Sequence, residues 1–108
     1  GGSKYLKELY SKFDDIPDSV QRLKFTMASY NCGYYHVRDA QKLAETQNLD
    51  PTQWDDHVEE MILALSYPKN YNKEIIKYGY VRGIEPYEYV EQIFKRYDHY
   101  TQFIEKNA

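Results

Sequence analysis

Residues 24–33 read Lys-Phe-Thr-Met-Ala-Ser-Tyr-Asn-Cys-Gly, a helical pattern that ends in a polar pair and a glycine. Leu23, Met27 and Tyr30 are spaced by four and three residues, so they share one face of an α-helix. We expect this face to enter the core. Gly33 suits the position after the last helical turn, because glycine has no Cβ to clash in a left-handed conformation. Asn31 is therefore expected at a helix end, where side chains line a cleft.

The same helical spacing of apolar residues recurs along most of the chain, and prolines and polar clusters interrupt it. No stretch of four to eight residues alternates cleanly with β-branched enrichment, so no strand is predicted. The sequence therefore predicts one compact all-α domain of five or six helices. The expected helices cover residues 4–13, 18–31, 34–46, 52–65, 73–80 and a long last helix that runs from 85 past 104.

Composition narrows the class of partner. The 108 residues carry a net charge of -3, which gives no basic field for nucleic acid, so nucleic-acid binding is not expected. Thirteen tyrosines, four phenylalanines and one tryptophan make 17% of the residues aromatic. Most of these rings are expected in the core or on half-exposed surface, and some are expected to stack on sugar rings.

Metal and thiol chemistry receive little support from the sequence. Cys32 is the only cysteine, which excludes an internal disulfide and a thiolate zinc cluster. His36, His57 and His99 each have a nearby aspartate, but each stands alone in its cluster, so we expect no metal and no cofactor. Cys32 and His36 could form a nucleophile and base, but Gly33 interrupts the helix between them, which disfavours this reading.

No apolar run approaches the roughly 18 residues of a membrane span, and no signal sequence opens the chain. Residues 1–3, Gly-Gly-Ser, are interpreted as the remnant of an expression tag, and residues 4–108 as the domain.

Residues 28–33, Ala-Ser-Tyr-Asn-Cys-Gly, resemble the Ala-Tyr-Asn-Ala-Gly motif of the soluble lytic murein transglycosylases. The resemblance extends in order over nearly all of the chain and looks like the membrane-bound branch of these enzymes. It implies a lysozyme-like helical fold of the goose-type lysozyme and lytic transglycosylase superfamily, truncated at its N-terminal side. The other matching segments are residues 5–6, 22–25, 36–40, 54–59, 78–80 and 85–90.

The resemblance also implies a chemistry. Enzymes of this family cleave peptidoglycan glycan strands with a single glutamate that acts as acid and then as base, and they leave 1,6-anhydromuramic ends. In the family that glutamate lies in a Glu-Ser motif, followed by a Gly-Leu-Met-Gln-like motif, before the segment that matches Tyr5. Neither motif occurs in this sequence. The chain is therefore expected to be the C-terminal part of a catalytic domain, inactive alone, from an exported parent protein of the periplasm or cell envelope, with or without a membrane anchor.

The resemblance also implies which residues form the site, through the motifs that match. Glu85 and Tyr89 are expected to support the site, with the Tyr89 hydroxyl directed toward the place of the catalytic glutamate. Pro86 replaces the family's threonine, and Tyr34 and Tyr35 replace its Pro-Gly, which adds two rings. The residues expected to bind the glycan are Tyr30, Asn31, Gly33, Tyr78 and Tyr80.

A second class of function is a non-catalytic helical module that binds glycan or another protein. A Glu-Ser pair in the native sequence just before Lys4 would favour the enzyme, and its absence from the gene would favour the module. For a truncated domain we expect apolar faces at Leu6, Leu9, Met27 and Tyr89 to be uncovered, and we therefore expect self-association.

Overall fold

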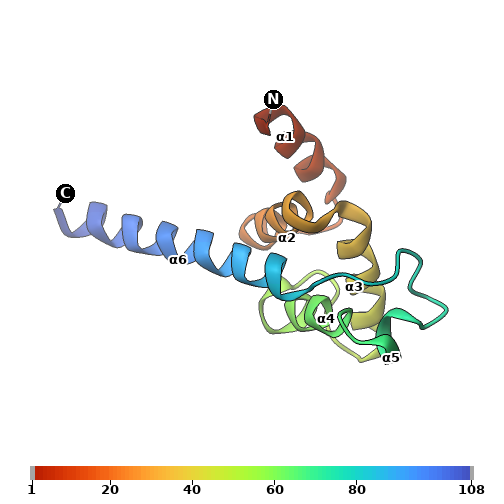
Figure 1. The fold of residues 1–108 in the computed structure, drawn as a ribbon. Helices are drawn as coiled ribbons and strands as arrows, with labels where there is room; N and C mark the ends of the chain where they lie inside the picture. The colour runs from red at the N-terminus through yellow and green to blue at the C-terminus, as the bar shows by residue number, and fades with distance from the viewer. Residues whose placement is uncertain (1, 108) are drawn as a thin grey trace.

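The computed structural model describes residues 2–107, and it describes side chains for residues 2–98 (Figure 1). No strand occurs within residues 2–107, so the predicted all-α fold class is confirmed. None of the helices described there is both long and apolar enough to cross a bilayer. The elements, in chain order, are α1 (Gly2–Lys12), α2 (Ser19–Cys32), α3 (Tyr34–Thr46), the distorted turn η1 (Trp54–Val58), α4 (Glu59–Ala64), α5 (Pro68–Tyr71) and α6 (Ile84–Asn107).

Helix α2 is the centre of the fold and packs against α1, α3 and α6 (Figure 1). It starts where the sequence predicts, because an Asp18 carboxylate oxygen accepts a 2.9 Å hydrogen bond from the Gln21 N–H. It ends at Gly33, whose φ of 109° favours glycine and whose N–H donates to the Ser29 carbonyl at 2.8 Å.

The face of α2 that enters the core differs from the prediction. Leu23 and Tyr30 are 42% and 43% exposed, whereas Phe25 and Ala28 are fully buried. The Phe25 ring lies between the rings of Phe13 and Trp54, at centroid distances of 5.5 and 5.6 Å. The Phe25 face is buried in preference to the predicted face of Leu23, Met27 and Tyr30, because large aromatic rings bury the most apolar area.

The apolar surface expected to be uncovered is present only in part. Leu9 is buried, contrary to the expectation. Leu6 and Met27 are half-buried and line an open apolar groove of about 320 Å³ between α1 and α2, together with Tyr10 and Leu23.

The predicted helix over residues 52–65 is broken at its start. Asp55 has ψ of 123° and Asp56 has φ of 66°, so regular helix begins only at Glu59. The cause is a contact distant in sequence. The Gln21 side-chain oxygen accepts from the Trp54 N–H at 2.7 Å and from the Asp55 N–H at 3.2 Å, and it holds this backbone in an irregular turn.

The predicted helix over residues 73–80 is also absent, and a short helix, α5, lies instead at Pro68–Tyr71, where a break was predicted. The fully buried carboxylate of Asp39 in α3 accepts from the backbone N–H groups of Lys77 and Tyr78, at 3.2 and 2.8 Å. These donors are therefore not available to carbonyls one helical turn back. Gly79, with φ of 72°, turns the chain further.

The last helix, α6, starts beside α4 and packs along α2, and its C-terminal half extends away from the other helices (Figure 1). Val90 contributes to the core, and Phe94 packs against it. The side chain of His99, which the sequence analysis considered for metal binding, lies outside the described residues.

Candidate functional site

An open cavity of about 270 Å³ lies where the end of α2, the start of α3 and the segment that leads into α6 meet. It is the place where three of the predicted site residues come together: Asn31, Tyr80 and Glu85. Asn31 comes from the end of α2, whereas Tyr80 and Glu85 lie five residues apart near the start of α6. The complete lining is Asn31, Cys32, His36, Tyr80, Val81, Arg82, Glu85 and Pro86.

The cavity has an anchored wall. Val81 donates its N–H to the Leu65 carbonyl, and the Gly83 N–H donates to the Ser66 hydroxyl at 3.0 Å, which fixes the segment before α6 on the end of α4. Pro86 is buried in the first turn of α6, a position where the missing proline N–H costs nothing. These contacts hold Tyr80 and Glu85 opposite Asn31 before any ligand binds.

Glu85 is exposed and forms an ion pair with Arg82, with a nitrogen to oxygen distance of 2.9 Å. An exposed pair of this kind contributes little to stability. The carboxylate and the guanidinium thus supply one acceptor group and one donor group to the same rim of the cavity.

Cys32 and His36 both line the cavity, but they do not form a nucleophile and base. Burial raises the pKa of the Cys32 thiol to about 12, so it stays protonated at neutral pH. Its Sγ lies 3.8 Å from the Gly33 carbonyl oxygen. The His36 Nδ1 atom is buried and has no hydrogen-bond partner among the described residues.

Four predicted site residues are not among the lining side chains of this cavity. Tyr30 packs its ring against Tyr5 at 6.0 Å on the outer face of α2. Gly33 forms the bend between α2 and α3, and the Tyr78 ring stacks on the Tyr35 ring. Tyr89 is half-buried and follows Glu85 by four residues, so it lies one turn further along the same face of α6.

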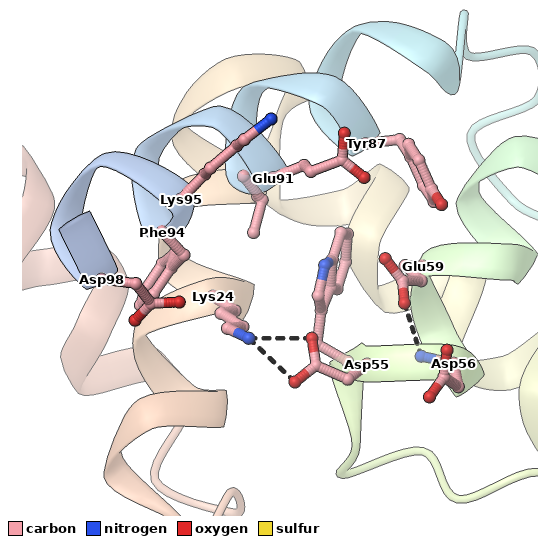
Figure 2. A pocket seen from close by; sticks show the side chains of 11 residues that line it. Lys24, Asp55, Asp56, Glu59, Tyr87, Glu91, Phe94, Lys95 and Asp98 are labelled. Carbon is pink, nitrogen blue, oxygen red and sulfur yellow. Dashed lines mark hydrogen bonds and ion pairs between the residues drawn. The ribbon is translucent and has the colours of Figure 1, made fainter.

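A larger pocket of about 550 Å³ lies between α2, the turn η1 and α6 (Figure 2). Five carboxylates and two ammonium groups line it, together with Trp54, Tyr87, Val90 and Phe94. Lys24 contacts both carboxylate oxygens of Asp55 at 2.8 and 2.9 Å, as Figure 2 shows. Asp55, Asp56 and Glu59 thus line a pocket, and the excess negative charge of the lining disfavours anionic ligands.

The Glu59 carboxylate in this pocket is partly buried and is repelled by neighbouring carboxylates. Burial raises the pKa of the Glu59 carboxyl, and the neighbouring charges of Asp55, Glu60 and Asp56 raise it further, although the Asp56 N–H donates to it. Partial burial acts to raise the pKa of the Asp55 carboxyl, but the hydrogen bonds from Lys24 and Gln21 together with the Lys24 charge outweigh it, so the pKa is lowered. Ionised Glu59 therefore costs stability at neutral pH, and this cost disappears as the pH falls below its ordinary pKa of 4.5.

Replacing Glu59 by glutamine should stabilise the chain by about 0.5 kcal/mol at pH 7, a small gain because solvent screens these carboxylates. The amide oxygen still accepts from the Asp56 N–H. Urea unfolding at pH 7 and pH 4 measures the effect, which should vanish at the lower pH. Glu88→Gln, on the exposed side of α6, is the control and should change nothing. A destabilised Glu59→Gln variant at pH 7 would contradict this account.

Sequence reasoning missed Arg82, and it considered His36 only for metal and thiol chemistry, both of which it disfavoured. Arg82 carried a signal, since it precedes Glu85 by three residues at the start of a helix. His36 carried none, because its place in the cavity depends on the sharp bend at Gly33.

Residues 1–53 match the family model of the transglycosylase SLT domain. A protein of Shewanella woodyi is 46% identical over 99 residues, which cover 91% of this chain and 20% of that protein. A protein of Desulfosudis oleivorans is 44% identical over 97 residues, which cover 90% of this chain and 21% of that protein. Both are named membrane-bound lytic murein transglycosylase F. The chain thus spans about a fifth of the length of the curated relatives it matches.

Proposed function

Because this chain belongs to the transglycosylase SLT family, we propose that residues 4–108 are part of the catalytic domain of a peptidoglycan lytic transglycosylase. The substrate of the parent protein is then the glycan strand of peptidoglycan, and the product carries 1,6-anhydromuramic ends. The parent acts in the periplasm or cell envelope, in keeping with the words "membrane-bound" in the names of its relatives.

The observation that carries the proposal is the convergence of Asn31, Tyr80 and Glu85 on one cavity. An amide with two donors and one acceptor group, a ring and a carboxylate match the hydroxyls, N-acetyl groups and apolar faces of an aminosugar. The sequence contains no Glu-Ser pair, so we infer that the general acid comes from another part of the parent protein.

Electrostatics favour this cavity over the larger pocket as the glycan site. Muramic acid carries a carboxylate. The pocket of Figure 2 is lined by five carboxylates and only two ammonium groups, so its lining has an excess of negative charge. The smaller cavity contains Arg82 and His36 beside its single carboxylate. An anionic strand is therefore repelled less by the smaller cavity.

In this proposal Tyr89 and Tyr30 lie outside the cavity and support the site indirectly. Tyr89 lies one turn beyond Glu85 on α6 and is assigned to the neighbourhood of the general acid. Tyr30 and the apolar groove beside Leu6 and Leu23 face the rest of the parent protein, and in the isolated chain this groove is the surface for self-association.

Replacing Asn31 by alanine in the native parent protein should lower kcat/KM for the release of anhydromuropeptides from sacculi about tenfold, the cost of one lost hydrogen bond to substrate. Asn31 is exposed, so the variant should fold normally. Tyr97→Ala, at an exposed site on α6, is the matched control and should retain full activity. The chain alone should release no product.

Two results would contradict the proposal in different ways. Full activity of Asn31→Ala would show that the substrate does not bind in this cavity. A parent protein that binds glycan but never forms anhydro ends would favour the non-catalytic module.

A further inference from the structure

Two exposed tyrosine rings form a flat stack beside the cavity. The rings of Tyr35, in the first turn of α3, and Tyr78, in the segment between α5 and α6, lie 4.6 Å apart at an interplanar angle of 20°. They are 54% and 52% exposed. Since one face of each ring is used in the stack, exposure of this size leaves the outer face of Tyr78 open to solvent.

Neighbouring residues hold both tyrosines of the stack in place. The Tyr34 ring meets Tyr35 edge-on at 5.2 Å, and the Tyr34 hydroxyl accepts a 2.8 Å hydrogen bond from Arg38. The Tyr78 backbone is held by the buried Asp39 carboxylate. The flat surface therefore exists before a ligand arrives, and its ordering costs no further conformational entropy on binding.

The stack and the cavity share two chain segments. Tyr35 immediately precedes His36, and Tyr78 lies two residues before Tyr80; His36 and Tyr80 line the cavity. We therefore expect a polymer that occupies the cavity and extends beyond it to reach the open ring of Tyr78.

We propose that the Tyr35–Tyr78 stack, defined by these two rings, is a further sugar subsite that binds a pyranose ring of the glycan strand outside the cavity. This proposal rests on the proposed function. It adds that a glycan must be long enough to reach from the cavity to the stack before it gains affinity from these rings. The apolar C–H face of an N-acetylhexosamine matches a flat uncharged ring, and the net charge of -3 disfavours stacked nucleic-acid bases as the alternative. Asp39 is a positioning residue for this subsite, because it acts through the Tyr78 backbone.

The experiment titrates the full chain with N,N′-diacetylchitobiose, which we expect to occupy the cavity alone, and with hexa-N-acetylchitohexaose, which we expect to reach the stack, while amide chemical shifts are followed. Tyr78→Ala should weaken chitohexaose binding about fivefold to tenfold and leave chitobiose binding unchanged. Tyr78→Phe keeps the ring and should bind as the unmodified chain does. Tyr97→Ala is the control for loss of an exposed tyrosine ring.

Asp39→Asn should weaken the hexasaccharide and not the disaccharide, whereas general loosening of the fold would weaken both. Equal chitohexaose affinity of Tyr78→Ala and the unmodified chain would overturn the subsite, and the proposed function would stand if Asn31→Ala still weakened both ligands. Failure of the unmodified chain to bind either ligand would overturn the subsite and the glycan cavity together.

Discussion

Alanine at position 83 should destabilise the chain by about 3 kcal/mol or more, the upper range for overpacking of a buried site. Gly83 is buried against the backbone of α4. A methyl group there would overlap the carbonyl oxygen of Ile62 and lie 2.6 Å from its carbonyl carbon and 2.7 Å from the Leu63 Cα. Backbone atoms cannot move aside as a flexible side chain does, so the segment before α6 must lift off α4.

Urea unfolding followed by Trp54 fluorescence measures this loss. Gly79→Ala is the matched control, because Gly79 has φ of 72° but no atom within 4 Å of the added methyl group. It should cost only about 1 kcal/mol, the strain of a left-handed alanine. Because Glu85 and Pro86 follow Gly83 by two and three residues, Gly83→Ala should also disturb the cavity. Similar losses in the two variants would show that the close approach to α4 is not what requires glycine at position 83.

Local signals predicted the elements whose ends are set locally. The start of α2 at Ser19 follows from the Asp18 cap, its end from Gly33, and the bounds of α3, Tyr34–Thr46, agree with the apolar stripe that begins after that glycine. Each of these signals acts within one or two helical turns of the residue it controls.

Distant hydrogen bonds set the parts that the sequence did not predict. Asp39 takes the backbone donors of Lys77 and Tyr78, and Gln21 takes those of Trp54 and Asp55. A periodic apolar pattern carries no information about a buried side chain that arrives from another helix. The two helices mispredicted over residues 52–65 and 73–80 are the two segments held in this way.

The candidate site divides along the same line. Asn31 and Glu85 were nominated from matched motifs, and the fold brings them to one cavity. Tyr35 and Tyr78 stand far apart in the sequence, and only the anchoring of Tyr78 by Asp39 makes them neighbours. Pairwise stacking of this kind cannot be read from either residue alone.

Gln21 makes three hydrogen bonds that join α2 to the turn η1, although it lies in the predicted polar start of a helix. It is 7% exposed, and its amide nitrogen donates to the Asp55 carboxylate at 2.9 Å while its oxygen accepts from the two backbone N–H groups of the turn. The same turn places Trp54 in the core against Phe25. One side chain therefore links the irregular backbone of η1 to the position of the core tryptophan.

Replacing Gln21 by alanine should cost about 2–4 kcal/mol, because it leaves the N–H groups of Trp54 and Asp55 without their acceptor in a largely buried place. Urea unfolding measures the loss, and Trp54 fluorescence should report a looser environment in the folded state. Gln21→Glu is the informative second variant, since its carboxylate keeps the acceptor but faces Asp55. Relative to the unmodified chain it should be destabilised at pH 7 and recover as the pH falls below about 4, where the introduced carboxylate is protonated. Loss of stability in Gln21→Glu that did not change with pH would show that shape, rather than the charge beside Asp55, controls this junction.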